Sequence, residues 1–272
     1  MNVVRHYHHS FHYSYETSLK KHFFVIGLAA LGIIVLLLPA LHFIAPTRIL
    51  ISPNDLSSAR LIEACFATVY RLTIAYIFAI VLAIPLALVI TKSPKFERIL
   101  LPTFDIIQSI PVLAFFPVIV LVFVKVNFFD GAAIFVLFMA MLWNIVFSMV
   151  GGLKTIPQDI EAAAFVFKSK GLRKLAKITL PAVFPYLVTG SLLAWAQGWN
   201  ILIVAEVLHN YIPNGNSSQD LYGLGSLLVN ASYQGKNLVF ISSLVAMIII
   251  IGLMNFFIWQ KLLHLAERYK FD

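Results

Sequence analysis

The chain has 272 residues, of which 60% are hydrophobic and only 12% are charged. This composition excludes an ordinary soluble domain and is typical of an integral membrane protein. The formal net charge of +8 would suit nucleic acid, but the basic residues cluster in short segments between long apolar runs, which favours a role in membrane orientation instead. The single cysteine, Cys65, excludes an intrachain disulfide and a cysteine-based metal site.

The chain begins with a polar, histidine-rich head, residues 1–22. Its histidines are close enough in sequence for a metal site to be conceivable, yet no carboxylate or cysteine stands at ligand spacing. We therefore expect a cytoplasmic tail and no metal site.

Six charge-free apolar runs are long enough to cross a bilayer, because about 20 helical residues span roughly 30 Å of hydrocarbon. The runs lie at 23–45, 72–90, 106–124, 131–153, 182–205 and 237–260. The first is too long for a secretory signal peptide and no cleavage pattern follows it. We expect an all-α membrane protein with six transmembrane helices in one domain, residues 23–265, followed by a short cytoplasmic tail, 266–272.

The basic residues predict the orientation. Placing the N-terminus in the cytoplasm puts 15 of the 20 lysines and arginines on the inner side, a strong positive-inside bias. Both termini are then cytoplasmic, and the loops at 91–101 and 154–181 face inward. Arg71 is expected to mark the outer boundary of the second span.

The third run is the most interrupted. Pro111 and Pro117 each remove a backbone hydrogen bond, and Asp105, Gln108 and Ser109 precede them. A kinked helix beside a polar path would suit a gate, while a bent helix that only packs well is the alternative. Asp105 is open to both interpretations.

Polar residues inside other runs are candidates for a solute path, since ionisable and amide side chains are costly in a membrane. The candidate path residues are Gln108, Asn144, Trp199, Asn200 and Glu206. Two alternatives stay open. For Glu206 the alternative is an interfacial carboxylate that reaches water, and for Asn144 it is a hydrogen bond to a neighbouring helix.

The fifth run also carries a stripe of small residues, Gly190, Ala194 and Gly198. Their four-residue spacing places them on one helix face, where they permit a second helix to approach closely.

The long inner segment EAAAFVFKSKGLRKLAKITLP, residues 161–181, does not look catalytic. It has Asp159 and Glu161 nearby but neither histidine nor a metal-ligand set. The chain also lacks the glycine-rich pattern that cradles nucleotide phosphates. If transport uses ATP, a partner must therefore supply the hydrolysis.

Instead, the segment predicts a helix–turn–helix hairpin. Thr155 and Gln158 form a capping-box pattern, so a helix is expected to start there, with Phe165 and Phe167 as apolar contacts on its alanine-rich body. A turn at 169–171 leads to a second helix. A docking element fits this design, and a basic loop resting on anionic lipid is the alternative.

The hairpin resembles the EAA loop of permease subunits of binding-protein-dependent ABC importers. Glu161-Ala162-Ala163 and Ile178-Thr179-Leu180-Pro181 match that pattern. Phe167 stands where the family has glycine and Gly171 follows four residues later, so the helix is expected to turn later than in the family. Four stretches, 106–120, 199–208, 221–228 and 255–271, are similar to the nitrate, sulfonate, taurine and bicarbonate branch.

This resemblance implies a MetI-like permease in a prokaryotic cytoplasmic membrane. Its partners would be a second permease subunit, two cytoplasmic ATPase subunits, an external solute-binding protein and membrane lipid, but no nucleic acid. The chain would bind no cofactor, since ATP and Mg²⁺ belong to the ATPases, and would not itself be an enzyme. The coupling residues carried over are Asp159, Glu161, Ala162, Ala163, Phe167, Gly171, Leu180 and Pro181.

The resemblance further implies that solute passes between the two permeases, so the stripe of Gly190, Ala194 and Gly198 is expected near that interface. The implied substrate is a small anion such as nitrate, a sulfonate or bicarbonate. The alternative function is a stand-alone channel or an ion-coupled transporter, which Asp105, Asn144 and Glu206 would serve.

Overall fold

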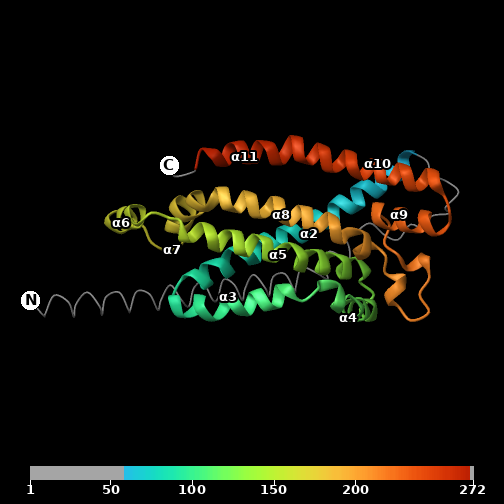
Figure 1. Cartoon of the computed structure of the whole chain (residues 1–272), viewed down its shortest axis with the longest axis horizontal. Helices are drawn as coiled ribbons and strands as arrows, with labels where there is room; N and C mark the ends of the chain where they lie inside the picture. The colour runs from blue at the N-terminus through green and yellow to red at the C-terminus, as the bar shows by residue number, and fades with distance from the viewer. Residues whose placement is uncertain (1–57, 270–272) are drawn as a thin grey trace, which may run out of the picture.

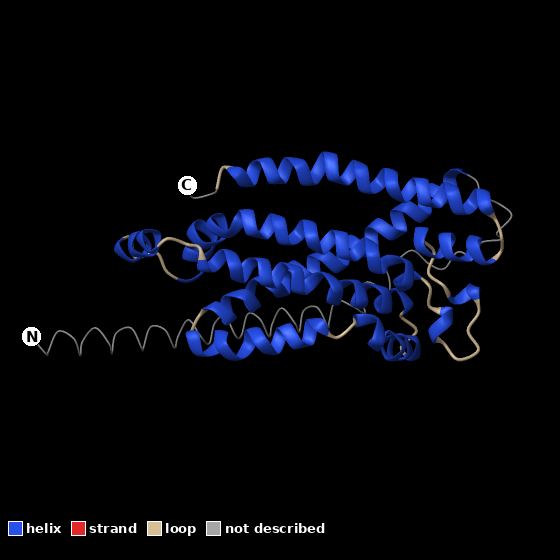
Figure 2. Cartoon of the chain, in the orientation of Figure 1, coloured by secondary structure: helices blue, strands red, loops and turns tan. Residues whose placement is uncertain are grey.

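The computed structural model describes residues 58–269, so the expected tail 1–22 and first span 23–45 lie outside the described residues. Within 58–269 every regular element is a helix (Figure 2). The helices run roughly side by side, with loops and short helices gathered at the two ends (Figure 1).

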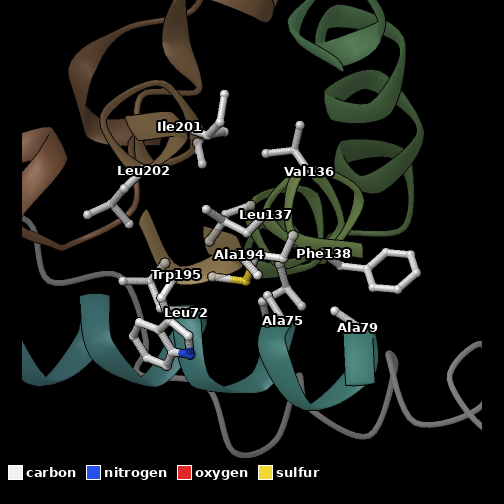
Figure 3. Packing of buried hydrophobic residues seen from close by; sticks show 14 of the residues in the cluster. Leu72, Ala75, Ala79, Val136, Leu137, Phe138, Ala194, Trp195, Ile201 and Leu202 are labelled. Atoms are coloured by element: carbon white, nitrogen blue, oxygen red, sulfur yellow. The ribbon is translucent and has the colours of Figure 1, made fainter. Parts of the chain in front are cut away.

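Three long helices form the core: α2 (Ser58–Thr91), α5 (Phe129–Lys154) and α8 (Leu180–Glu206). Figure 3 shows side chains of α2, α5 and α8 interleaving, with alanines such as Ala75, Ala79 and Ala194 beside larger residues such as Leu137 and Leu202. Because small residues let the helix backbones approach, packing can hold the three together without a hydrophobic driving force between helices.

The helix α2 starts well before the expected span at 72–90. The sequence predicted a boundary at Arg71 because a charge interrupts the apolar run there. In the structure Arg71 lies inside the helix and is 0% exposed. The helix therefore does not begin at Arg71. The residue lies level with Asp130 in the first turn of α5 and Glu206 at the end of α8, whose carboxylates neutralise its charge.

The expected third span, 106–124, is not one straight helix. It is divided between α3 (Pro94–Ser109) and α4 (Val112–Lys125), which bend by 78° at Ile110 and Pro111. Pro111 has no N–H to continue the helical hydrogen bonds, so α3 ends before it. The inward loop expected at 91–101 is also shorter than predicted, because α3 already begins at Pro94.

The remaining elements divide between the two ends of the bundle (Figure 1). At one end lie η3 (His209–Tyr211), η4 (Ser217–Gln219) and α9 (Leu224–Tyr233). At the other end lie α6 (Gln158–Val166), α7 (Gly171–Lys174) and the π-helix η2 (Leu175–Thr179), which continues into α8.

The last span consists of α10 (Asn237–Met254), the π-helix η5 (Asn255–Trp259) and α11 (Gln260–Glu267) without a break. Of the described helices, four are long and apolar enough to cross a membrane, and the bent pair α3 and α4 makes a fifth if it is counted as one span. The expected spans at 131–153 and 182–205 fall within α5 and α8.

Candidate functional site

The hairpin between α5 and α8 is the first candidate site, and its geometry is set by the end of α6. Three backbone N–H groups close this end: Phe167 donates to Ala163 O (3.0 Å), Lys168 to Phe165 O (3.0 Å) and Ser169 to Ala164 O (2.9 Å). This is a Schellman-type ending, which needs a left-handed residue after the helix. Lys168 provides it, with φ of 49°.

Two expectations about the hairpin are corrected by this geometry. The helix does not turn late at Gly171, because α6 ends at Val166 and Lys168 accepts the left-handed conformation that glycine usually takes. Gly171 also has a positive φ, 57°, but it starts α7 instead of ending α6. The capping box is absent too: Thr155 Oγ1 donates back to Gly152 O at 2.9 Å, and no side chain caps α6.

The tip of the hairpin presents uncovered apolar side chains. Phe165 is 74% exposed, Phe167 82% and Leu172 67%, whereas Ala164, directly before Phe165, is buried. We call Phe165, Val166, Phe167 and Leu172 the apolar tip; all four are large hydrophobic side chains that the chain leaves exposed. Such a cluster outside the helical bundle marks a binding surface.

The other expected coupling residues flank this tip. On α6, Asp159, Ala162 and Ala163 are exposed, and the side chain of Glu161 lies outside the described part of the structure. Leu180 and Pro181 form the first turn of α8 and are partly buried, so they fix the direction in which the hairpin leaves the bundle.

A buried ionic network at the opposite end is the second candidate site. Arg71 of α2 donates from Nε to Asp130 Oδ1 at 2.6 Å and from Nη1 to Glu206 Oε1 at 2.9 Å. The side chains of Arg71 and Glu206 are almost inaccessible, at 1% and 0% exposure. The guanidinium therefore links α2, the first turn of α5 and the last residue of α8.

The same network holds the segment that enters α9. Glu206 accepts hydrogen bonds from Thr68 Oγ1 at 2.8 Å and from Gly225 N at 2.8 Å, and Arg71 Nη1 donates to Tyr222 O at 2.9 Å. A methyl group on Gly223 would overlap the Glu206 carboxylate. Glycine is needed here because the backbone passes directly over the carboxylate.

Because of these contacts the Glu206 carboxylate does not face open space. It binds the segment that leads into α9 instead. The interfacial alternative, a carboxylate that reaches water, does not fit a side chain with 0% exposure. Sequence reasoning missed Arg71, Asp130 and Thr68 as its partners. The signal was a pair of opposite charges, Arg71 directly before the run 72–90 and Glu206 directly after the run 182–205, since charges at a membrane-spanning segment usually pair with one another.

A smaller polar cluster lies in the outer loop beside the network. Asp220 accepts from the backbone N–H of His209 at 3.0 Å, lies 2.8 Å from His209 Nδ1, and accepts from Asn230 Nδ2 at 3.0 Å. The phenol of Tyr222 donates to the backbone oxygen of Arg60, and burial raises the pKa of this phenol above its usual value. The loop is thus fastened to α2 and α9 at several points.

The other expected path residues are not brought together. Asn144 donates to Ala140 O of its own helix at 3.3 Å, Trp199 is buried in the core and Asn200 is exposed. Gln108 lies on the separate helix α3, where it donates to Asp105 Oδ1 at 2.9 Å. A pocket lined by Pro185, Thr189 and Gln260 among others includes none of these residues.

The stripe of small residues packs inside the chain. A methyl group on Gly190 would lie 2.6 Å from Ser148 Cβ, and one on Gly198 would overlap Met141. Both neighbours belong to α5, and Ala194 is 0% exposed. The close approach that the stripe permits is therefore between α5 and α8 of one subunit, where we had expected it near a subunit interface.

Within residues 58–269 no group of three or more histidine, cysteine, aspartate or glutamate side chains is placed to hold a metal ion. The network of Arg71, Asp130 and Glu206 is a set of buried ion pairs between helices.

Comparison with known proteins identifies the fold. Residues 79–268 match the family "Binding-protein-dependent transport system inner membrane component". This match covers most of the chain, so the protein belongs to that family, and it is a multi-pass membrane protein.

Three relatives illustrate the similarity. Nitrate import permease protein NrtB of Leptolyngbya laminosa is 32% identical over 160 residues, 59% of this chain and 56% of that protein. Bicarbonate transport system permease protein CmpB of Synechococcus elongatus is 27% identical over 186 residues, 68% of this chain and 61% of the relative. Taurine transport system permease protein TauC of Escherichia coli is 25% identical over 156 residues, 57% of this chain and 56% of that protein. The matched region thus spans less than two thirds of each relative.

Proposed function

We propose that this chain is the membrane-spanning permease subunit of an ATP-driven importer for a small solute. Two such subunits would form the translocation path, an external binding protein would deliver the solute, and two cytoplasmic ATPase subunits would supply the energy. The chain itself would carry out no hydrolysis and bind no nucleotide. Membership of the family and the names of its relatives support this assignment.

The observation that carries the proposal is the apolar tip. Its four side chains are each at least two-thirds exposed, which is unfavourable in water. Three of them lie at the end of α6, which has a fixed ending, and Leu172 lies on α7. A socket on an ATPase would cover them. Because η2 continues directly into α8, movement of a docked tip would be transmitted along α8 to the core.

The orientation follows from charge. The hairpin and the turn that precedes it are rich in basic residues: Lys154, Lys168, Lys170, Arg173, Lys174 and Lys177. The positive-inside bias supports a cytoplasmic location for this end. The end of α11 lies at the same end of the bundle (Figure 1), which supports a cytoplasmic C-terminus. With residues 23–45 as a further span, six helices and a cytoplasmic N-terminus are consistent with this orientation.

The substrate class is taken from the relatives, whose names give nitrate, bicarbonate and taurine. A small anion or a small sulfonate is therefore the proposed class. The second permease is proposed to be an identical chain, since the path requires two subunits.

The test is uptake into proteoliposomes that contain the permease, the ATPase subunits and the binding protein. Radiolabelled nitrate, bicarbonate and taurine serve as solutes. Uptake of one of them that requires ATP on the ATPase side and the binding protein on the other side is the expected result. Uptake by the permease alone under an ion gradient, without ATP, would instead support a stand-alone channel or an ion-coupled transporter.

A further inference from the structure

The helix α3 is held loosely against the rest of the described bundle. None of its residues is fully buried, and Leu100, Leu101 and Phe104 pack partly against the core. By contrast, α2, α5 and α8 each bury many side chains in the core. A helix with few buried apolar contacts changes position more easily than a helix fixed in a packed core. The helix α3 is therefore suited to move.

Two contacts of different chemistry join α3 to α5. The ring centroids of Phe104 and Trp143 lie 5.4 Å apart. Nearer the start of α3, Lys154 Nζ donates to Glu97 Oε1 at 2.5 Å. Glu97 and Phe104 are about two helical turns apart on α3, and Trp143 and Lys154 are about three turns apart on α5, so each helix uses one face for both contacts. The two helices therefore run antiparallel, and the ion pair lies at the end of the contact that is closer to α6.

The ion pair is directly connected to the hairpin. Lys154 is the last residue of α5, and α6 starts at Gln158. The connector between them is short and hydrogen-bonded, because Thr155 donates to Gly152 O from its backbone N–H at 3.2 Å and from Oγ1 at 2.9 Å. Pro157 restricts the connector further, since its ring fixes φ. A displacement of the apolar tip would therefore reach Lys154 instead of being absorbed by a flexible loop.

The exposure of the pair suits a contact that opens and closes. The side chains of Lys154 and Glu97 are 45% and 32% exposed, and ion pairs in contact with water contribute little to stability. Breaking this pair returns both charges to water. Breaking the buried pair of Arg71 and Glu206 would instead leave charges without partners. The inner pair can therefore break and re-form repeatedly, whereas the outer network stays closed.

We propose that Glu97 and Lys154 form a latch between α3 and α5, and that movement of the docked apolar tip opens and closes this latch. The inference rests on the proposed function, because an ATPase must move the tip. It adds a second route of coupling to the continuous path from η2 into α8. Through the latch the hairpin controls the position of α3 and, beyond the 78° bend, of α4. Glu97 and Lys154 are positioning residues, since neither has to touch the solute.

Charge reversal tests the latch. Glu97→Lys and Lys154→Glu each replace the attraction by repulsion, and the double variant restores an attraction with the charges exchanged. Lys95→Glu is the matched control, because it also replaces a lysine near the inner end of the bundle by glutamate. Lys95 lies two residues from Glu97 and therefore on a different side of α3.

The first readout is amide hydrogen exchange of residues 94–104 in the assembled, nucleotide-free transporter in lipid nanodiscs. Each single reversal is expected to accelerate this exchange about threefold, because α3 loses one of its contacts with α5. The double variant and Lys95→Glu are expected to exchange at the unsubstituted rate.

The second readout is the amount of solute taken up per ATP hydrolysed in proteoliposomes, with nitrate, bicarbonate and taurine as the solutes. Each single reversal is expected to lower this ratio about fivefold, and the double variant is expected to restore it. The amount of ATPase that co-purifies should not change in any variant, because the apolar tip is intact.

Three results would overturn the latch: single reversals with an unchanged ratio of uptake to hydrolysis, a double variant no better than either single variant, or a control that loses as much as Lys154→Glu. If a single reversal does not assemble, Glu97→Gln and Lys154→Gln take its place. They remove the pair without repulsion and are expected to change both readouts in the same direction.

The exchange readout needs neither ATP nor solute, so the two proposals can fail separately. Uptake that is independent of ATP would refute the importer assignment, while restored exchange in the double variant would still support the contact between α3 and α5. ATP-dependent uptake with a ratio that the reversals do not change would refute the latch alone.

Discussion

The two ends of the bundle differ in which side chains they expose and which they bury. The end that carries α6 leaves Phe165, Phe167 and Leu172 exposed, whereas the end that carries α9 buries Arg71 and Glu206. An exposed apolar cluster is stable only when something covers it. A buried ion pair is tolerated only when its partners are all in place. The first end is therefore incomplete without a partner, and the second is complete within the chain.

This difference predicts where substitutions act. Changes in the outer network should lower the stability of the subunit itself. Changes in the apolar tip should leave that stability alone and act on assembly.

The largest loss of stability is expected for Arg71→Met. The substitution removes the guanidinium and leaves Asp130 and Glu206 without their cation, and breaking one partner of a buried pair costs about 3–5 kcal/mol. The free energy of unfolding in mixed micelles, followed by circular dichroism during SDS titration, measures this loss. Adding Glu206→Gln should recover part of it, because one uncompensated charge is removed.

The matched control is Lys154→Met. Lys154 forms an ion pair with Glu97 at 2.5 Å, but the two side chains are 45% and 32% exposed. Solvent-exposed pairs contribute about 0–1 kcal/mol. If Arg71→Met cost no more than this control, the outer network would not hold the subunit together.

A smaller loss, about 1–3 kcal/mol, is expected for Gly223→Ala. The added methyl group would overlap the Glu206 carboxylate, and overpacking of a filled site costs this much. Because Gly223 enters α9, limited proteolysis of the outer segment should also become faster.

Gly252→Ala provides the comparison, since nothing lies within 4 Å of its added methyl group. It should leave both the unfolding free energy and the proteolysis rate nearly unchanged. Equal effects of the two alanines would show that backbone freedom, and not the approach to Glu206, explains the glycine at 223.

The smallest change is a gain. Lys168 adopts φ of 49° at the end of α6, a conformation in which glycine carries no penalty. Lys168→Gly is expected to stabilise the hairpin by about 1 kcal/mol. Slower amide hydrogen exchange in α6 measures the gain, with Lys170→Gly as a control because Lys170 has an extended conformation, with φ of −135°. No difference between the two variants would contradict a strained ending.

Several of these features could be predicted from the sequence. Long apolar runs gave the helical class and placed α5 and α8 closely, because hydrophobicity alone determines which segments enter a membrane. The alanine-rich body and the turn expected at 169–171 predicted a hairpin between them, and a helix does start at Gln158. Pro111 and Pro117 indicated an interrupted third span, and the chain breaks at the first of them.

Other features depend on contacts between distant segments, which one sequence does not reveal. The ion pairs of Arg71 were not expected, because its partners, Asp130 and Glu206, lie 59 and 135 residues away. The stripe at Gly190 correctly predicted that another helix approaches α8 closely. Which helix this is depends on the rotation of α8 about its axis, which the sequence does not show. The predicted position of the hairpin turn was wrong because Lys168 adopts a left-handed conformation that is expected of glycine.

The central claim is that the apolar tip docks on an ATPase, and Phe167→Ala tests it most directly. Phe256→Ala is the matched control, because Phe256 is also an exposed phenylalanine, at 68%, but lies on η5 in the last span. The measurement is the amount of ATPase subunit that co-purifies with each permease variant, together with the ATP hydrolysis of the complex that the binding protein stimulates. The account predicts that Phe167→Ala loses most of both while its unfolding free energy is unchanged, and that Phe256→Ala retains both. Co-purification and stimulated hydrolysis at the unsubstituted level in Phe167→Ala would contradict it.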